Sequence, residues 1–461
     1  MRLPLLLTLG SLTVLSLVVG CSDTGVDMGA ASGAGGADGS VGGSAGAAGG
    51  SAIIVVEGGS SGSGGIPANC SPRGPGDQDK DGWTFEQGDC NDCDPNINPG
   101  AIDVVTYKKD KDGKPTDEPA DTQVDEDCSG TPATAADTLS CDDGLVLSTT
   151  TDAFDAARAL GLCNVKVEEN PADPKQRRWG VLEAGFNAIS GGFLKNPLQP
   201  GVQVGIVPGF GTDTTPREGA RALVMSSAEA RAPGQEGYNA AHCALNTGLP
   251  SGSTSPAPGF PKQSHCEGGE GEPDDPLGGD PYNAVALDLK IRAPTNARSL
   301  KFNFRFFSCE YPEYTCRKFN DVFAVIMTPS TLTQGPMYDP ATNSANIAFD
   351  NNQNVIGVNN ADFFTACEPK AGSGYAGCTA GSSVKLIGSG FEDHGASAWL
   401  ATQASVPAPD GAQATIFYLR LAIWNAGDNQ LNSTAVIDNF QWSVEESSST
   451  PTTVIDPPPI H

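Results

Sequence analysis

The segment Leu300-Lys301-Phe302-Asn303-Phe304-Arg305-Phe306 indicates the fold class of this chain of 461 residues. Apolar and polar residues alternate in it, so an extended strand would be apolar on one face and polar on the other. The same period of two runs through residues 285–291, 417–423 and 436–444. Turn-forming residues are abundant, with 57 glycines and 35 prolines. The pattern predicts a mainly β protein whose residues 140–446 form a jelly-roll-like β-sandwich.

One short helix is expected beside the strands. Asp152 can accept hydrogen bonds from the first free N–H groups of the segment that follows it. Gly161 can adopt the left-handed backbone conformation that ends a helix. The sequence therefore predicts a helix over Ala153–Leu160.

Composition divides the remainder of the chain into four parts. Residues 1–20 have a basic start and then an apolar run, as in an export signal peptide. Residues 21–66 are almost entirely Gly, Ala and Ser, a composition that forms no core and predicts a disordered tether. Residues 67–132 are rich in Asp and Cys. Residues 447–461 are rich in Ser, Thr and Pro and are predicted to form a disordered tail.

Cys21 closes the apolar run in the sequence Val18-Val19-Gly20-Cys21, which is typical of a bacterial lipoprotein signal. Its thiol would be diacylated, so this end of the chain would be held at a membrane through a lipid anchor. The apolar run is shorter than the ~20 residues that a spanning helix needs. A cleaved secretory signal and a single spanning helix are the alternatives. Because Ser22 is compatible with export to the outer membrane, we expect the protein in the bacterial cell envelope.

Charge limits the partners of the protein. Its 55 acidic side chains against 27 basic ones give a formal charge of −28. A surface this negative repels phosphate backbones and attracts divalent cations. We therefore expect no nucleic-acid partner and a role for metal ions.

The 13 cysteines indicate an oxidising compartment. Without Cys21 an even set remains, which in an exported protein predicts disulfides rather than catalytic thiols. Local candidate pairs are Cys141 with Cys163, Cys243 with Cys266, Cys309 with Cys316, and Cys367 with Cys378. The pairing of the other four stays open, and these are Cys70, Cys90, Cys93 and Cys128.

A ladder of carboxylates opens the acidic segment. Asp77, Asp79 and Asp81 alternate along the chain before Gly82, which is how a loop directs several oxygens at one hard cation. Gly88 stands where an EF-hand carries its twelfth-position Glu, so the loop is not an EF-hand. Oxygen ligands favour Ca²⁺ over transition metals, and a solvated acidic linker is the alternative. The predicted ligands are Asp77, Asp79, Asp81, Asp89, Asp92, Asp94, Asp125 and Asp127.

This segment resembles the metal-binding repeat of bacterial surface proteins. The Asp ladder is followed by Gly88-Asp89-Cys90-Asn91-Asp92-Cys93-Asp94-Pro95, then by Pro99-Gly100-Ala101, then by Asp125-Glu126-Asp127-Cys128-Ser129-Gly130. It is more loosely similar to the Asp ladders of thrombospondin type-3 repeats. The chain departs from the repeat in carrying Cys70 and Cys93 and the insertion Lys108–Pro115.

A second resemblance covers roughly residues 180–445. Cys309-Glu310-Tyr311-Pro312-Glu313-Tyr314, Ala398-Trp399-Leu400-Ala401-Thr402 and Asp438-Asn439-Phe440-Gln441-Trp442 are similar to the choice-of-anchor L domain of bacterial surface proteins. That family occurs with varied cell-surface anchors. The resemblance implies display at the cell surface and brings no established activity.

Three acidic residues of this domain are candidates for a second metal site. Asp438 shares a predicted strand face with Phe440 and Trp442, where a charge without a partner would be costly. A Ca²⁺ ion shared with Asp321 or Glu310 would offset that cost. Exposure of Asp438 to water at a strand end would offset it too.

Three hypotheses of function follow. The first is a non-catalytic, Ca²⁺-stabilised surface lipoprotein that serves adhesion by binding extracellular polysaccharide or a surface protein. In this hypothesis Tyr311 and Tyr314 form a sugar-stacking platform, and the alternative is that they are packing residues. The second is metal sequestration by the acidic segment. The third is a secreted polysaccharide-active hydrolase that uses Glu310 and Glu313. We do not expect an enzyme, because two carboxylates separated by a proline need not converge as glycoside hydrolysis requires.

Overall fold

The computed structural model describes residues 54–55, 70–111, 115–134, 141–189, 192–195, 197–240, 243, 281–315, 317, 319–368, 378–408, 414–448 and 450–456. The predicted signal peptide, Cys21 and the predicted tether apart from residues 54–55 lie outside these ranges. In the described part, no helix is both long and apolar enough to span a membrane.

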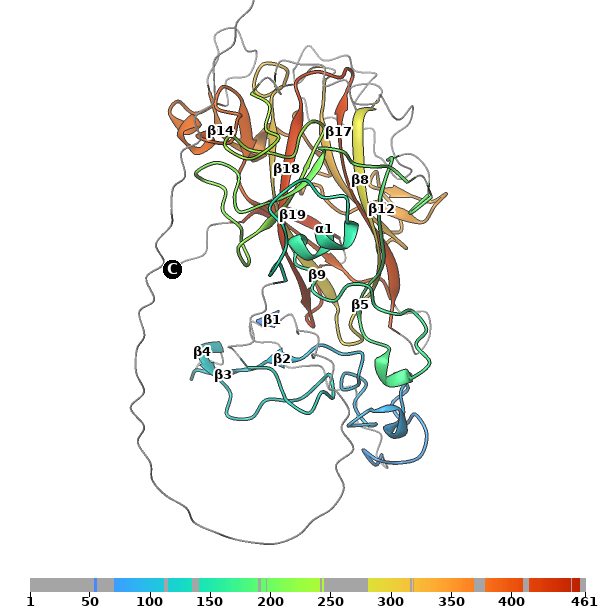
Figure 1. Cartoon of the computed structure of the whole chain (residues 1–461). Coiled ribbons are helices and arrows are strands. Elements are labelled where there is room, and N and C mark those ends of the chain that lie inside the picture. Colours follow the sequence, from blue (N-terminus) through green and yellow to red (C-terminus); the bar gives the residue numbers. More distant parts are fainter. Residues whose placement is uncertain are drawn as a thin grey trace, which may run out of the picture. The chain divides into compact units, whose positions relative to one another are not determined.

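Two antiparallel sheets form the body of the described chain (Figure 1). The first has seven strands in the order β11-β12-β10-β17-β8-β5, and β13 pairs with β10. These strands are β5 (Gly180–Asn187), β8 (Pro281–Arg292), β10 (Val322–Thr328), β11 (Tyr338–Asp339), β12 (Ser344–Asn346), β13 (Ile356–Gly357) and β17 (Ile416–Ala426).

The second sheet has eight strands in the order β14-β15-β9-β18-β7-β6. β16 joins this sheet at β9, and β19 pairs with β16. The strands are β6 (Val204–Val207), β7 (Ala222–Ser226), β9 (Ser299–Ser308), β14 (Phe364–Cys367), β15 (Gly395–Ser397), β16 (Leu400–Ser405), β18 (Ser433–Ser443) and β19 (Thr452–Ile455).

The remaining regular elements are short. α1 (Ala153–Leu160) begins after the side-chain cap of Asp152 and ends at Gly161, whose φ is 112°, so the helix prediction is confirmed. β1 (Ile54–Val55), within the predicted tether, pairs in parallel with β2 (Val104–Val105). The others are β3 (Tyr107–Lys109), β4 (Pro115–Pro119) and the 3-10 helices η1 (Phe85–Gln87), η2 (Pro174–Gln176), η3 (Ala361–Phe363) and η4 (Ser382–Leu386).

The main hydrophobic core lies between the two sheets. Phe304 of β9 meets Phe323 of β10 with ring centroids 4.8 Å apart, and Leu289 of β8 and Ile437 of β18 belong to the same cluster. All four side chains are fully buried. Burial of one such side chain stabilises the fold by roughly 1.5–3 kcal/mol, so the alternation in residues 300–306 decides which face of β9 turns inward. The prediction of a mainly β sandwich is confirmed.

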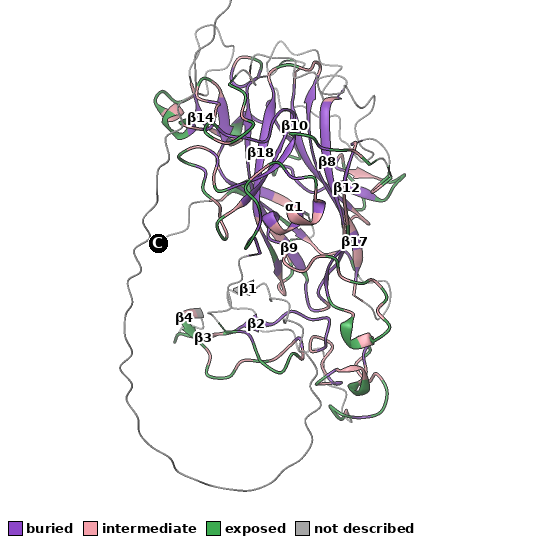
Figure 2. Cartoon of the chain, viewed as in Figure 1, coloured by how far each residue is buried: buried purple, intermediate pink, exposed green. Residues whose placement is uncertain are grey.

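The outward faces of both sheets are buried too, although the alternation did not indicate this. Asn303 and Arg305 of β9 are only 0% and 2% exposed. Arg305 donates to the carbonyl of Ser397 (2.9 Å) and to a carboxylate oxygen of Asp213 (3.0 Å). A second apolar cluster covers this face, and a third covers the outer face of the other sheet. Figure 2 accordingly shows the central strands as buried on the whole.

The acidic segment makes specific contacts with residues of the sandwich. Ile102 enters the main core, and its backbone N–H and C=O both bond to the side chain of Asn296, at 3.0 and 2.8 Å. Arg177, which follows η2, donates to the carbonyl of Gly82 (2.7 Å) and lies 4.0 Å from the ring centroid of Trp83. Residues 67–132 and 140–446, which the sequence suggested as separate parts, therefore share apolar and polar contacts.

Five disulfides occur among the described residues. Cys141–Cys163 and Cys367–Cys378 are expected pairs, whereas Cys70–Cys93 and Cys90–Cys128 resolve the open pairing of the acidic segment. Cys243 bonds to Cys309, with Cα atoms 5.4 Å apart. The predicted pairs Cys243–Cys266 and Cys309–Cys316 are therefore wrong, because proximity along the chain does not measure proximity in the fold. Cys266 and Cys316 themselves lie outside the described residues.

The C-terminal segment contributes a strand, in contrast to the predicted disordered tail. β19 pairs antiparallel with β16, with Leu400 opposite Ile455. The backbone N–H of Thr453 donates to the carbonyl of Phe349 at 3.1 Å, and its hydroxyl lies 2.8 Å from that of Thr402. β-Branched residues favour strands where a neighbouring edge is available. The composition of residues 447–461 did not reveal that β16 offers such an edge.

Asp456 holds the end of β19, and its loss is expected to destabilise the protein. Its carboxylate accepts a hydrogen bond from the amide of Asn303 (2.8 Å) and lies 3.5 Å from Arg217 Nη1 and 3.6 Å from Lys301 Nζ. Asp456→Ala should lower the free energy of unfolding by about 1–3 kcal/mol, since hydrogen bonds to charged groups contribute that much. Urea denaturation measures the change, with the exposed Asp393→Ala as control. An unaltered midpoint would mean that backbone pairing alone holds β19.

Candidate metal centre

The loop over residues 77–83 is wound around the side chain of Asp77. This carboxylate accepts hydrogen bonds from the backbone N–H groups of Lys80 (2.6 Å) and Gly82 (3.1 Å). Both donors have left-handed backbone conformations, with φ of 68° and 96°. Glycine at position 82 adopts this conformation without steric cost, so the chain can turn sharply there. Asp81 in turn accepts the backbone N–H of Trp83 at 2.8 Å.

Two triads of carboxylates meet in this segment. One oxygen each from Asp77, Asp79 and Asp81 lie within 4.8 Å of one another, and so do oxygens of Asp79, Asp89 and Asp92. Asp79 belongs to both triads. The sequence predicted all five residues as ligands, and the structure brings them together.

Three carboxylate oxygens of these triads are buried and have no hydrogen-bond partner in the described part of the chain. They are the Oδ2 atoms of Asp79, Asp81 and Asp89. Asp81 and Asp89 are only 7% and 1% exposed. A buried polar group without a partner costs about 1–3 kcal/mol, and more when it is charged. Divalent cations among the triads would satisfy these oxygens.

Burial, with repulsion from neighbouring carboxylates, perturbs the acidity of the same residues. It raises the pKa of Asp79 to about 6, the pKa of Asp89 to about 7 and the pKa of Asp81 to about 8. The cluster therefore resists carrying its full negative charge at neutral pH unless a cation is present. A donor set made only of oxygens fits Ca²⁺, which takes about six to eight such ligands, better than metals that prefer nitrogen or sulfur.

A third triad includes one residue that the sequence analysis missed. Oxygens of Asp103, Asp125 and Asp127 lie within 4.8 Å of one another. Asp103 is 3% exposed, and burial raises its pKa to about 6. Its carboxylate accepts the backbone N–H of Asp127 at 3.0 Å, and Arg178 lies 3.8 Å from Asp127. Asp103 stands alone in the sequence, outside any ladder, so only the fold assigns it to a cluster.

Asp94 is the predicted ligand that lies outside all three triads. Its Oδ1 accepts hydrogen bonds from the backbone N–H of Asn96 (3.1 Å) and from the amide of the same residue (2.9 Å). Its charge nevertheless helps to raise the pKa of Asp79. Asp94 therefore contributes negative potential to the cluster and shapes the loop.

Glu310 and Asp321 form a buried carboxyl pair where β9 ends and β10 begins. They are 1% and 0% exposed and are joined by a side-chain hydrogen bond. Asp321 also accepts the backbone N–H of Ala426 (3.0 Å) and the hydroxyl of Ser433 (2.6 Å). Burial raises the pKa of Asp321 to about 8 and raises the pKa of Glu310 well above its usual value. These raised pKa values favour a proton shared by the pair at neutral pH, which would offset the charge that burial makes costly.

Asp438 does not join Glu310 and Asp321. Its Oδ2 accepts the backbone N–H groups of Arg217 (2.5 Å) and Glu218 (3.0 Å). Asp321 contacts Ser433, which lies five positions before Asp438 on β18. At about 3.3 Å per residue, Ser433 and Asp438 are therefore roughly 16 Å apart along the strand. The candidate second site of these three acids is therefore not assembled in the structure.

A β-bulge explains why the predicted strand face of Asp438 differs from the observed one. The register of β18 against β9 shifts between Asp438 and Gln441, and Asn439 has a φ of 58°. Val436 packs in the outer cluster, whereas Phe440 and Trp442 pack in the main core. The extra residue of a bulge inverts the alternation beyond it, so Asp438 lies on the face opposite to both aromatic rings.

The two candidate stacking tyrosines do not form an open platform. Tyr311 is fully buried, and its ring stacks on that of Phe364 with centroids 3.9 Å apart. Tyr314 is 37% exposed and packs edge-on against Phe319 at 5.5 Å. The packing alternative therefore describes Tyr311, whose ring no sugar can reach.

Comparison with known proteins identifies one domain. Residues 266–440 match the family model of the choice-of-anchor L domain. The match includes β8 to β17 and most of β18, whereas β5, β6 and β7 precede it and belong to the same two sheets. No curated protein and no solved structure matches the chain. Residues 266–440 therefore form a choice-of-anchor L domain, and this domain indicates a surface-associated protein.

Proposed function

We propose that the protein is a non-catalytic adhesion protein of the bacterial cell surface whose fold is stabilised by Ca²⁺ in the acidic segment. In this proposal a lipid on Cys21 anchors it to the outer membrane, and the sandwich binds extracellular polysaccharide or a surface protein. The single observation that carries the Ca²⁺ part is the convergence of three buried, partnerless oxygens from Asp79, Asp81 and Asp89. Solvated acidic linkers have no reason to bury carboxylates in this way.

The environment of Glu310 supports a non-catalytic role. A glycosidase needs two carboxyl groups on either side of a substrate bond. Glu310 is 1% exposed and its hydrogen-bonded neighbour is the fully buried Asp321. A polysaccharide cannot reach a carboxyl group in that position, and the third hypothesis is therefore less favoured.

Contacts of the acidic segment favour a structural ion over sequestration of metal. The triad residue Asp81 bonds to Trp83, and Trp83 packs under Arg177 next to η2. An ion at Asp81 would thus stabilise residues that the sandwich contacts. A sequestering segment would need exposed ligands of its own, whereas Asp89 and Asp92 are buried.

The test is thermal unfolding of the purified protein with Ca²⁺ and with EDTA. The proposal expects a clear loss of stability in EDTA, together with loss of attachment to polysaccharide or cells. A melting temperature that is the same with Ca²⁺ and with EDTA would contradict the proposal of a structural ion. Cu²⁺ or Zn²⁺ retained in preference to Ca²⁺ would favour sequestration instead.

The stabilisation by Ca²⁺ is expected to grow as the pH rises from about 5 to about 8. In the Ca²⁺-free protein the pKa values of Asp79, Asp89 and Asp81 lie above the unfolded value of about 4. The folded state therefore binds more protons than the unfolded state. The contribution of these three carboxyl groups to the free energy of unfolding is lost as the pH rises through about 6 to 8. Bound Ca²⁺ removes this loss, because it keeps the same carboxylates ionised and paired.

The measurement is the difference between the melting temperatures in Ca²⁺ and in EDTA, taken as a function of pH. In this difference the effects of groups that titrate elsewhere in the chain, such as Asp321, cancel. A difference that stays constant or shrinks with rising pH would contradict the assignment.

A further inference from the structure

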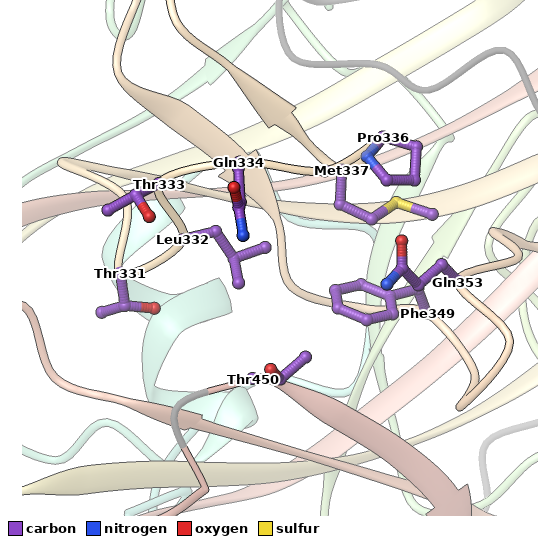
Figure 3. Close-up of a pocket in the computed structure, with 10 residues that line it drawn as sticks. Thr331, Leu332, Thr333, Gln334, Pro336, Met337, Phe349, Gln353 and Thr450 are labelled. Carbon is purple, nitrogen blue, oxygen red and sulfur yellow. The ribbon is translucent and has the colours of Figure 1, made fainter.

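A cavity of 530 Å³ lies beside the first sheet, away from the acidic segment. Its walls come from the loop 331–337 between β10 and β11, from the turn around Phe349 and Gln353, and from Thr450 just before β19. Figure 3 shows Leu332 on one side of the space and Phe349 with Met337 on the other. Its volume is within the range of about 300–1,000 Å³ that is usual for pockets that bind small molecules.

Local hydrogen bonds fix these walls. The hydroxyl of Ser330 accepts the backbone N–H of Leu332 at 2.9 Å. Asp350 accepts the backbone N–H groups of Asn352 and Asn354, both at 2.8 Å, and so shapes the turn that carries Gln353. Gln353 itself has a φ of 65°, an uncommon conformation for a residue other than glycine. The cavity is therefore built by defined turns of the chain.

None of the described residues that line the cavity has an ionisable side chain, although the chain carries a formal charge of −28. Hydroxyls are provided by Thr331, Thr333 and Thr450, and primary amides by Gln334 and Gln353. Apolar surface comes from the side chains around Phe349 and Met337. The hydroxyl oxygen of Thr331 is shielded from solvent and has no hydrogen-bond partner in the described part of the chain, so Thr333 and Thr450 supply the hydroxyls that a ligand can reach.

We infer that this cavity binds one neutral sugar residue of an extracellular polysaccharide. A sugar ring presents hydroxyl groups that both donate and accept, which the Thr hydroxyls and Gln amides can match, and C–H faces that pack on apolar walls. A charged ligand would find no counter-charge among the lining residues. A wholly apolar ligand would displace water from the lining hydroxyls and amides without replacing its hydrogen bonds, at a cost of about 1–3 kcal/mol for each group left unpaired.

This inference rests on the proposed role of the sandwich in binding, and it names the site and the ligand class. It also moves the site away from Tyr311 and Tyr314, since the first is buried and the second packs against Phe319. The cavity is independent of the carboxylate triads, because none of their residues lines it.

The experiment screens the purified protein in Ca²⁺ against neutral hexose oligosaccharides, namely cellohexaose, laminarihexaose, maltohexaose and mannohexaose, with oligogalacturonate as the anionic comparison. Isothermal titration then compares Thr333→Val and Gln334→Ala with the parent protein. Thr333→Val keeps the shape and removes the hydroxyl of an exposed residue, so folding is preserved. Each variant should lose about three- to tenfold in affinity, as the loss of one hydrogen bond predicts.

Matched controls are Thr365→Val on β14 and Gln403→Ala on β16, which make the same chemical changes outside the cavity. Binding of a neutral hexaose that both cavity variants weaken and both controls retain supports the inference. Equal binding by all five proteins overturns the site but leaves the proposed binding role intact. Preference for oligogalacturonate, or no saccharide binding at all, overturns the ligand class, whereas the Ca²⁺ proposal is judged separately by unfolding in EDTA.

Discussion

EDTA is expected to lower the melting temperature of the purified protein and to loosen the acidic segment first. If Ca²⁺ is present at about 100 times its dissociation constant, its removal withdraws about 2.7 kcal/mol of stability. The buried oxygens of Asp79, Asp81 and Asp89 then repel one another or take up protons. Trp83 is fully buried and its backbone N–H donates to Asp81, so the part of the tryptophan fluorescence that is lost in Trp83→Phe reports the local change, and far-ultraviolet circular dichroism reports the sandwich.

Two variants decide whether the effect belongs to the triads. Asp89→Asn keeps the shape of a side chain that is 1% exposed and removes its charge, so added Ca²⁺ should stabilise this variant much less. Asp121→Asn removes a charge from an exposed residue of the same segment that pairs with Lys108 at 3.0 Å, and it should respond to Ca²⁺ as the parent does. Identical responses of all three proteins would place the ion elsewhere.

The substitution Asp288→Ala is expected to cost about 3–5 kcal/mol of stability, the largest effect of any single change considered. Asp288 is 0% exposed and forms a two-pronged pair with Arg420, with Nε–Oδ1 at 2.7 Å and Nη2–Oδ2 at 2.8 Å. It also accepts hydrogen bonds from Asn187 and from the backbone N–H of Leu194, each at 2.7 Å. Removal of one partner of a buried pair leaves the other charge uncompensated.

Urea denaturation measures this cost, and an exposed carboxylate in the same sheet provides the control. Glu183→Ala removes a carboxylate that is 55% exposed and lies 3.0 Å from Lys290, which should change stability by less than about 1 kcal/mol. The double variant Asp288→Ala/Arg420→Ala should be less destabilised than the sum of its single variants, because the second change removes the stranded charge. Additive losses would mean that the two side chains act independently.

Local patterns in the sequence predicted strands β8, β9, β17 and β18, the helix α1 and the main candidate ligands. The alternation in residues 300–306 predicts the face of β9 that packs against Phe323, and Asp152 with Gly161 predicts both ends of α1. Asp77, Asp79 and Asp81 predict a carboxylate cluster because their spacing alone brings them close. In each case the residues concerned are near neighbours in the chain, so short-range geometry is sufficient.

Such local patterns did not predict contacts between residues that are distant in the sequence. The outward side chains of Asn303 and Arg305 alternate as if they faced water, yet both are buried. Arg305 bonds to loop residues Asp213 and Thr214, and the carbonyls of Ser397 in β15 and Leu400 in β16 accept hydrogen bonds from Arg305 and Asn303. The bulge at Asn439 reverses the predicted face of Asp438. The cavity near Gln353 is assembled from segments about 100 residues apart, and no motif marks it.

The sequence by itself thus determined the inward face of β9, the capped helix, the choice-of-anchor L resemblance and the acidic ladder, because hydrophobic period and ligand spacing act over a few residues. The tertiary structure alone decided that Cys243 bonds Cys309, that Asp103 joins a triad and that Asp438 stays apart from Asp321. The reason is physical: these distances depend on how two sheets and their covering loops pack, and packing is a property of the whole chain.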